Sequence, residues 1–280
     1  MASASISYKD RLLPHLADYR RSVLGIPEAG VFHHRGRDVS VEHVLPRSAG
    51  KWVAIPDEGR STVQSVVTKY GVKLHRHFHH LNSSQAFALS LFAPFFEPRG
   101  VAARALLHAL GIAEDDIRDW RPEAVPNSQE GTNLDAWWLT ESGIEYFCEV
   151  KLTEAEFGSA RNDSRHQEKL RTIYLPRLEG LVASKLLAPA PFFSAYQILR
   201  NIWHAASSPT ARVLFLFPRG QPALSRQLDV VLDSLAPTLR NRVFVAHTED
   251  VLVSLAAKAS PTTLGRYATA LAAKYLPPTT

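Results

Sequence analysis

The amino-acid sequence predicts an α/β protein in which a mixed β-sheet is flanked by helices. Two strand-like runs, residues 132–140 and 144–152, are separated by only three residues, which favours antiparallel neighbours. Beyond them, helical and strand-like segments alternate along the chain, a pattern typical of parallel addition to a sheet. Antiparallel strands followed by alternating helices and strands therefore indicate a mixed sheet with helices on both faces.

The first part of the chain has a mainly helical pattern. Apolar residues at helical spacing predict a helix over residues 7–24. Scattered prolines and glycines interrupt the pattern over about 25–73, where a loop-rich subdomain and short strands are both compatible with the sequence. A strongly apolar stretch at 83–96 follows polar capping residues, and its length favours a buried helix. Another helix is expected over 101–110, closed by a glycine.

The length of 280 residues suits one large domain or two small ones. We expect residues 1–75 to form an N-terminal helix and a loop-rich region packed on or preceding the core, and residues 76–280 to form the core domain. After the two strands, the pattern predicts helices over about 163–174, 194–206 and 222–235 and on to about 275, with strands over 213–217 and 242–247.

The composition is that of a globular protein, with 45% hydrophobic and 21% charged residues. No stretch approaches the roughly 20 apolar residues of a membrane span, and no apolar run follows a basic start. We therefore expect an intracellular, cytoplasmic protein without membrane contact. The single cysteine, Cys148, excludes an internal disulfide and an all-cysteine zinc site. A net charge of +5 and a pI near 9.4 suit a polyanionic partner.

The two strand-like runs place charged residues on a shared face. Within residues 144–152, Glu149 and Lys151 are two positions apart and point to the same side. The three residues between the runs suit a three-residue hairpin loop in which Gly143 takes the left-handed conformation. The resulting register sets Asp135 opposite Glu149, whereas a turn of two or four residues would reverse the facing.

This arrangement predicts a metal site. Directly opposed residues have Cβ atoms only ~4.5–5.5 Å apart, so the carboxylates of Asp135 and Glu149 repel each other unless a cation lies between them. Oxygen ligands favour Mg²⁺, with Mn²⁺ as a substitute, and we expect Asp135, Glu149 and the Val150 carbonyl as ligands. Lys151 is placed to orient a water or to meet negative charge that develops on a phosphate. A metal, a water and a cation are the parts that phosphodiester hydrolysis requires.

The middle of the chain holds a compound motif: Gly131-Thr132-Asn133-Leu134-Asp135, a hairpin, and then Glu149-Val150-Lys151. This motif resembles the PD-(D/E)XK nuclease superfamily. Two further segments, His79–Gln85 and Tyr196–Asn201, resemble a group of bacterial restriction-endonuclease-like proteins, and the resemblance covers roughly residues 80–220. It implies a restriction-endonuclease-like core with a helix, a three-stranded antiparallel meander, a second helix and a parallel strand.

The resemblance also implies residue roles. Asp135 and Glu149 would hold the metal, and Lys151 would assist the attacking water. Gln197 stands on a helix after the metal strands, where related nucleases often carry a polar residue that reaches the site; a solvent-facing glutamine is the alternative. Gln85 lies on the first core helix, where an acidic group is often found, so sites with one metal and with two metals both stay open.

Several residues are candidates for DNA contact. Arg161 and Arg165 lie one turn apart if their segment is helical, and Lys169 follows in the same basic stretch, so all three are placed to contact phosphates. An ordinary solvated surface is the alternative. His79 and Asn82 are further candidates, with partial burial as the alternative for the histidine.

Two weaker patterns suggest other metal chemistry. His75, His77 and His79 would share a face if their segment were extended, with His80 beside them, which would allow zinc binding. The segment Glu42-His43-Val44-Leu45-Pro46 resembles the first half of an HNH nuclease motif, in which a histidine activates water. The flanking cysteine pairs and the following asparagine of that motif are missing.

Together these observations predict a Mg²⁺-dependent endonuclease that hydrolyses phosphodiester bonds of double-stranded DNA, in restriction or another genome-defence role. A DNA repair or recombination nuclease is one alternative. A non-catalytic DNA-binding module that keeps the fold is another. The sequence is compatible with a monomer and with a homodimer.

Overall fold

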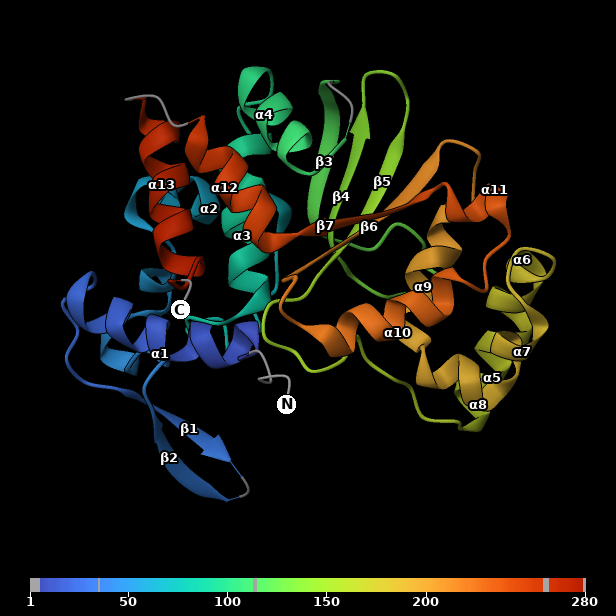
Figure 1. Ribbon diagram of the computed structural model, residues 1–280, viewed down its shortest axis with the longest axis horizontal. Coiled ribbons are helices and arrows are strands. Elements are labelled where there is room, and N and C mark those ends of the chain that lie inside the picture. The colour runs from blue at the N-terminus through green and yellow to red at the C-terminus, as the bar shows by residue number, and fades with distance from the viewer. Residues whose placement is uncertain (1–5, 35, 113–114, 259–261, 279–280) are drawn as a thin grey trace, which may run out of the picture. The chain divides into compact units, whose positions relative to one another are not determined.

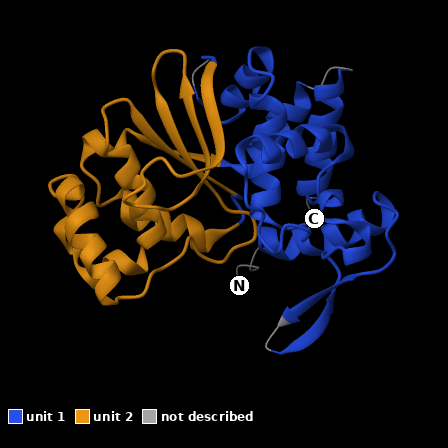
Figure 2. Cartoon of the chain, turned by 180° about the vertical axis from the view of Figure 1, so that it is seen from behind, with its two compact units in different colours: residues 1–116, 218–220, 247–280 blue, residues 117–217, 221–246 orange. Residues whose placement is uncertain are grey.

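The computed structural model describes residues 6–34, 36–112, 115–258 and 262–278, and the chain forms two compact units (Figures 1 and 2). Unit 1 comprises residues 1–116, 218–220 and 247–280, and unit 2 comprises residues 117–217 and 221–246. Unit 1 thus combines segments from both ends of the chain, whereas the predicted division at residue 75 follows chain order. That domain boundary remains a prediction.

Unit 2 is built on a five-stranded sheet in the order β3-β4-β5-β6-β7. β3 pairs antiparallel with β4, β4 pairs antiparallel with β5, and β5 pairs parallel with β6. The expected mixed sheet, with a meander followed by a parallel strand, is therefore confirmed. The strands are β3 (Ile117–Ala124), β4 (Leu134–Thr140), β5 (Glu145–Val150), β6 (Ala211–Phe217) and β7 (Val243–His247).

The strand β3 was not predicted. It carries Pro122 and alternates exposed or half-buried charged residues with buried ones. A proline cannot donate to a hydrogen-bonded ladder, so within sheets it is confined largely to edges, and β3 is an edge strand here. The same proline and charges that suit an edge obscured the strand in the sequence.

The β4–β5 hairpin has the predicted register. Thr140 donates its N–H to the Ile144 carbonyl at 2.9 Å, and Gly143 in the intervening loop has a φ of +83°. The paired residues run from Leu139 opposite Glu145 to Ala136 opposite Cys148. One further step along this ladder brings Asp135 opposite Glu149.

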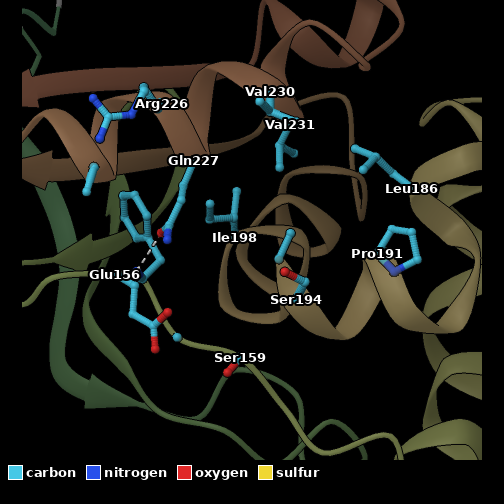
Figure 3. Close-up of a pocket in the computed structure, with 14 residues that line it drawn as sticks. Glu156, Ser159, Leu186, Pro191, Ser194, Ile198, Arg226, Gln227, Val230 and Val231 are labelled. Carbon is cyan, nitrogen blue, oxygen red and sulfur yellow. Dashed lines mark hydrogen bonds between the residues drawn. The ribbon is translucent and has the colours of Figure 1, made fainter.

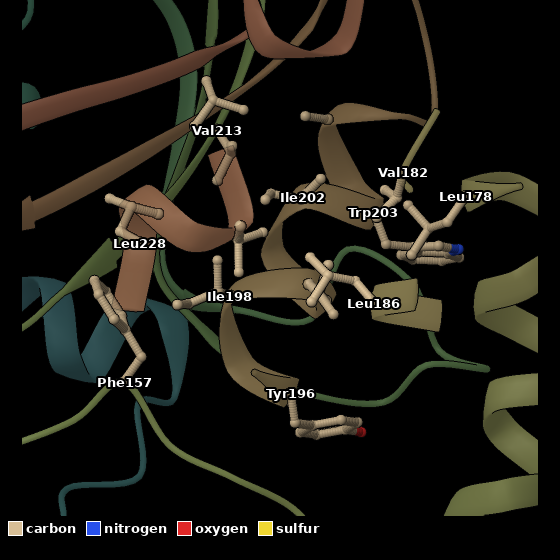
Figure 4. Close-up of a cluster of buried hydrophobic side chains, with 14 of the residues drawn as sticks. Phe157, Leu178, Val182, Leu186, Tyr196, Ile198, Ile202, Trp203, Val213 and Leu228 are labelled. Carbon is tan, nitrogen blue, oxygen red and sulfur yellow. The ribbon is translucent and has the colours of Figure 1, made fainter. Parts of the chain in front are cut away.

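Helices of unit 2 pack against the sheet, and α9 (Tyr196–Ala205) lies against β5 and β6. Its buried residues Ile198 and Ile202 join Val213 of β6 in a large apolar cluster (Figure 4). Burial of each such side chain contributes about 1.5–3 kcal/mol, so the cluster fixes α9 on the sheet. The other helices are α5 (Ser164–Lys169), the π-helical turn η3 (Leu170–Tyr174), α6 (Leu175–Leu178), α7 (Ser184–Leu187), α8 (Pro189–Ser194), α10 (Pro222–Leu232) and α11 (Pro237–Arg240).

Unit 1 is mainly helical, and α3 is its buried centre. From Gln85 to Phe96 every residue of α3 is buried, and Ser83 caps its first turn, as the apolar run predicted. None of the helices in the described ranges is long and apolar enough to cross a membrane. The helices are α1 (Tyr8–Ser22), α2 (Asp57–Tyr70), α3 (Ser84–Phe96), α4 (Val101–Ala109), α12 (Thr248–Ala257) and α13 (Thr263–Tyr275), with short 3₁₀ turns η1 (Arg47–Ala49) and η2 (Lys51–Ala54).

The segment that the sequence left undecided, about residues 25–73, holds both short strands and a full helix. β1 (Gly30–His34) and β2 (Arg37–Val41) form a separate two-stranded antiparallel sheet. The helix α2 follows Pro56, carries two acidic residues in its first turn and ends at Gly71, whose φ is +62°. These are ordinary start and stop signals, but α2 has a weak apolar stripe and was overlooked.

Lys274 in α13 is fully buried, and its ammonium donates a hydrogen bond to the Ala54 carbonyl. Burial lowers its pKa from 10.5 to about 7. The folded state therefore bears the full cost of the buried charge below about pH 7, and the cost disappears as the pH rises toward 10.5.

We therefore expect Lys274→Met to increase the free energy of unfolding by roughly 2 kcal/mol at pH 6–7, with the gain shrinking toward pH 10. Thermal melts of the variant and of the exposed control Lys258→Met over this pH range check the expectation. A constant difference across the range would contradict it.

Candidate active site

The candidate site lies in unit 2, where the ends of β4 and β5 meet α9. Asp135 is the second residue of β4, Glu149 is the fifth of β5, and Lys151 follows β5 directly. Oδ2 of Asp135 accepts a hydrogen bond from the Val150 N–H at 2.7 Å. Lys151 donates its own N–H to the Leu216 carbonyl of β6 at 2.8 Å, which holds its backbone in line with the sheet.

The carboxylate of Glu149 is buried, with only 3% of the residue exposed, and both of its oxygens are hydrogen-bonded. Oε1 accepts from Gln197 Nε2 at 2.5 Å and lies 3.0 Å from Lys151 Nζ. Oε2 accepts from Asn201 Nδ2 at 3.0 Å, and a guanidinium nitrogen of Arg200 lies 3.7 Å away. The buried charge is thus compensated by one amine, two amides and a nearby guanidinium.

Lys151 bridges the strand and the helix. Its Nζ lies 3.0 Å from Glu149 Oε1 and donates to Gln197 Oε1 at 3.0 Å. Burial opposes the charged form of Lys151, but the carboxylates of Glu149, Asp135 and Glu154 outweigh it and raise its pKa. The amine therefore stays protonated at neutral pH and is available as a cation and a hydrogen-bond donor.

Asp135 lacks such compensation. Burial, together with the negative charges of Glu149 and Glu123, raises the pKa of its carboxyl well above the usual 3.8, against the positive charge of Lys151. Its Oδ1 accepts no hydrogen bond from any residue that the structure describes. The ionised form of Asp135 is therefore the component of the site that a bound cation would stabilise most.

The donor atoms fit a hard divalent cation. Asp135 and Glu149 offer carboxylate oxygens from the neighbouring strands β4 and β5. The carbonyl of Val150, between Glu149 and Lys151 in the chain, offers a backbone oxygen. Oxygen donors of this kind suit Mg²⁺ or Mn²⁺. Within the described ranges, no group of three or more His, Cys, Asp or Glu side chains is assembled as a metal site, so backbone oxygens and water would have to complete the shell.

Two polar residues of α9 reach Glu149. Gln197 was predicted from the sequence, and the structure places its amide against both Glu149 and Lys151. Asn201 was missed, although it lies four residues after Gln197 and therefore on the same face of the helix. Arg200, also missed, approaches the same carboxylate.

Gly158 fixes the start of α9 beside the site. Its carbonyl accepts the Gln197 N–H at 3.2 Å, and its φ is +126°. A Cβ at this position would come within 2.7 Å of Gln197 Oε1, so only glycine leaves the amide in place.

A pocket of about 610 Å³ adjoins this glycine (Figure 3). It is lined by residues 156–159 and by parts of α7, α8, α9 and α10, and the Phe157 N–H donates to Gln227 Oε1 at its wall. The side chains of the candidate site, Asp135, Glu149 and Lys151, do not line it. The pocket and the candidate site therefore both adjoin Gly158 and α9, but the pocket contains none of the three charged residues of the site.

The residues predicted to contact DNA lie in different structural environments. Arg161 and Arg165 are exposed, but α5 begins at Ser164, so the prediction that these two arginines lie one turn apart on a helix is wrong. Asp163 caps α5 and leaves Arg161 outside it. Lys169 is half-buried and donates to the Glu130 carbonyl at 2.5 Å. Contact of these residues with DNA remains a prediction.

The remaining candidates, Gln85, His79 and Asn82, belong to unit 1. Gln85 is buried, accepts from the His75 N–H at 2.8 Å and donates to the Lys73 carbonyl at 3.1 Å. This amide holds the preceding loop, and its accessory role in catalysis remains a prediction. In unit 2, by contrast, Glu123 is a third carboxylate whose charge acts on Asp135, and it went unnoticed because β3 was not predicted.

The two rival metal patterns are not supported by their geometry. The histidine segment is not extended: Phe78 N–H bonds back to the His75 carbonyl and His80 N–H to the His77 carbonyl, so the premise of a shared face is wrong. In the HNH-like segment, the Glu42 carboxylate is engaged by Arg20 at 2.8 Å and by Arg21 at 2.9 Å.

A buried lysine held between carboxylates and amides at the end of a sheet is an arrangement typical of catalytic centres. The family model described as restriction endonuclease associating with ARP matches residues 14–276, and the chain belongs to this family. This membership indicates a nuclease role. No curated protein and no solved structure shows significant similarity to the chain.

Glu149 has hydrogen-bond donors on both oxygens, whereas burial and neighbouring carboxylates raise the pKa of Asp135, and this difference leads to a prediction about stability. Because the folded pKa of Asp135 is raised, its ionised form costs stability above the unfolded value of about 3.9, and the cost is complete once the pH exceeds the folded pKa. In EDTA, Asp135→Asn should be more stable than the parent by roughly 1–2 kcal/mol at pH 8, and the gain should vanish as the pH falls toward 4.

Glu149→Ala is the matched comparison. It leaves Nε2 of Gln197 without its acceptor and removes one of two acceptors from both Asn201 and Lys151, so it should cost about 3 kcal/mol. Thermal melts of both variants against pH give the answer. An Asp135→Asn protein less stable than the parent at pH 8 would show that the aspartate is a structural anchor.

Proposed function

We propose that the protein is a Mg²⁺-dependent endonuclease of the PD-(D/E)XK type, with a restriction-endonuclease-like core, which hydrolyses phosphodiester bonds of double-stranded DNA. The observation that carries the proposal is the meeting of Asp135, Glu149 and Lys151 at the ends of adjacent strands, with Gln197 bonded to the last two. Family membership supports a nuclease role and DNA as the substrate. A restriction or other genome-defence role, a cytoplasmic location and a possible homodimer are parts of the same proposal.

In this proposal Asp135, Glu149 and the Val150 carbonyl hold the cation. When bound, the cation supplies positive charge for the scissile phosphate and makes a water easier to deprotonate. Lys151 positions that water or meets the charge that develops on the phosphate. Gln197 holds the amine of Lys151 and the carboxylate of Glu149 at once, so it sets the distance between the two groups.

The intact set of charged groups favours an enzyme over an inert DNA-binding module. A buried glutamate with four polar neighbours, beside an aspartate whose pKa is raised by burial and by neighbouring carboxylates, is costly to keep. A module that only binds DNA gains nothing from this arrangement. A repair or recombination nuclease would use the same site, so the distinction from restriction concerns the biological substrate and not the chemistry.

Metal dependence tests the proposal directly. With Mg²⁺ or Mn²⁺ the protein should cleave plasmid and linear duplex DNA, EDTA should abolish cleavage, and Ca²⁺ should support binding without efficient turnover, because Ca²⁺ relaxes the ligand geometry. Digests and gel shifts run in parallel measure both properties. Asp135→Asn should lose cleavage by at least about 10³-fold. Undiminished cleavage by this variant, or an activity that zinc supports and magnesium does not, would count against the site.

Lys151→Met separates catalysis from binding. The substitution keeps much of the side-chain stem and removes the charge and the donors that reach Glu149 and Gln197. Single-turnover cleavage should fall by about 10²–10⁴-fold, while the affinity for the same duplex should change little, because one contact carries a small share of DNA binding. Equal losses in rate and affinity would assign Lys151 to binding alone.

A further inference from the structure

The two-stranded sheet of unit 1 is unusually exposed. β1 and β2 pair antiparallel from Gly30 opposite Val41 to the end of the hairpin, and the ribbon extends away from the helices of unit 1 (Figure 1). Four of the five residues of β2 are exposed, and on neighbouring strands Val31 and Val39 are 55% and 45% exposed. A lone two-stranded hairpin is at best marginally stable in water. We therefore expect that a binding partner would stabilise the ribbon.

The ribbon packs against the rest of unit 1 on one face and borders a hollow on the other. On one face Phe32 packs edge-on against His77 and His80, with ring centroids 5.2 and 5.5 Å apart. On the other face, a hollow of about 350 Å³ separates Val31, His33 and Asp38 from Arg47 in η1. The ribbon, η1 and the loop of residues 73–80 thus form one surface of unit 1, which we call the ribbon surface.

The charge of the ribbon surface is positive. Asp38 of the ribbon pairs with His33 at 2.8 Å, and Glu42, which directly follows β2, pairs with two arginines of α1. Four basic side chains of this surface are exposed and form no ion pair with any carboxylate in the described part of the chain; they are Arg37, Arg47, Lys73 and Arg76, of which Arg76 donates a hydrogen bond to His77 Nε2 at 2.6 Å. Three of them, Arg37, Arg47 and Arg76, come from three different segments around the ribbon.

This combination suits duplex DNA. The major groove is wide enough to admit a two-stranded β-ribbon, and most protein–DNA hydrogen bonds go to phosphates. A protein partner that adds a strand to the ribbon edge would be recognised by main-chain hydrogen bonds and side-chain pockets, and it would not require several exposed basic side chains.

We propose that the ribbon surface is a second DNA-binding site, separate from the candidate active site of unit 2. The β1–β2 ribbon enters the major groove, Arg37 contacts the DNA from within the ribbon, and Arg47 and Arg76 contact phosphates that flank the groove. The inference rests on the proposed function for its choice of DNA, but it concerns binding alone.

The test is DNA affinity measured without cleavage. The triple variant Arg37→Gln/Arg47→Gln/Arg76→Gln is compared with the parent and with Lys258→Gln, which removes a positive charge elsewhere in unit 1. Fluorescence anisotropy with a labelled duplex is recorded in EDTA over a range of salt concentrations. The triple variant should bind at least tenfold more weakly, and the slope of log K against log salt should fall by about 2–3, because up to three phosphate contacts are lost. The control should match the parent.

Cleavage at saturating DNA with Mg²⁺ distinguishes failure of this inference from failure of the proposed function. Weaker binding with nearly unchanged saturated cleavage supports both. Weaker binding by a protein that never cleaves DNA supports the ribbon surface and overturns the nuclease proposal. A triple variant that binds with the affinity and salt slope of the parent overturns the ribbon surface, whatever the cleavage assay shows.

Hydrogen exchange provides a second measurement that needs no substitution. Addition of duplex DNA in EDTA to the unaltered protein should slow exchange of the amides in β1 and β2. An unchanged exchange rate in the ribbon, while DNA is bound elsewhere on the protein, would overturn the inference. Slow exchange that is already present without DNA, and increases with protein concentration, would also overturn it and would point to pairing between copies of the chain.

Discussion

The buried carboxylate of Glu149 constrains much of unit 2. An ionised group with so little exposure is tolerated only where its lone pairs are all met, and the partners of Glu149 come from two elements that are distant in sequence. Lys151 directly follows β5, whereas Gln197 and Asn201 come from α9. The apolar contacts that seat α9 on β5 and β6 therefore do more than fill the core, because they hold two amides at hydrogen-bond distance from one charge.

The part of this site that lies on the hairpin could be predicted because it depends on local rules. Alternation along a strand, a three-residue loop with one left-handed glycine and fixed antiparallel spacing are enough to bring Asp135 opposite Glu149. Gln197 came from a resemblance, and Asn201 could have been found from it by helical spacing alone. Glu123 could not be found in this way, since its strand is an edge whose proline and charges mask the alternation.

Other parts of the fold depend on non-local contacts. In unit 1, α1 contacts α13, and the hydroxyl of Tyr8 donates a hydrogen bond to the Tyr275 carbonyl at 2.6 Å. No local sequence pattern predicts a contact between residues so far apart in the chain. In the histidine segment, a local pattern was present but predicted the wrong conformation. Its spacing suggested an extended strand with a shared face, whereas backbone hydrogen bonds fold it into turns, so spacing alone misplaced the side chains. The undecided N-terminal segment proved to contain the exposed ribbon on which the second DNA-binding site is proposed.

The two carboxylates of the site are physically unequal, and this inequality bears on how it would be used. Both oxygens of Glu149 are already occupied by donors from Lys151, Gln197 and Asn201, whereas Oδ1 of Asp135 has no donor among the described residues and its carboxyl has a raised pKa. A cation held by both carboxylates would relieve the repulsion at Asp135 and would compete with Lys151 for Glu149. The ion pair between Glu149 and Lys151 would then be weaker, whereas the hydrogen bond from Lys151 Nζ to Gln197 Oε1 would still position the amine. In the proposed enzyme, the positive charge of Lys151, which Glu149 neutralises in this structure, would then be available to a phosphate or a water.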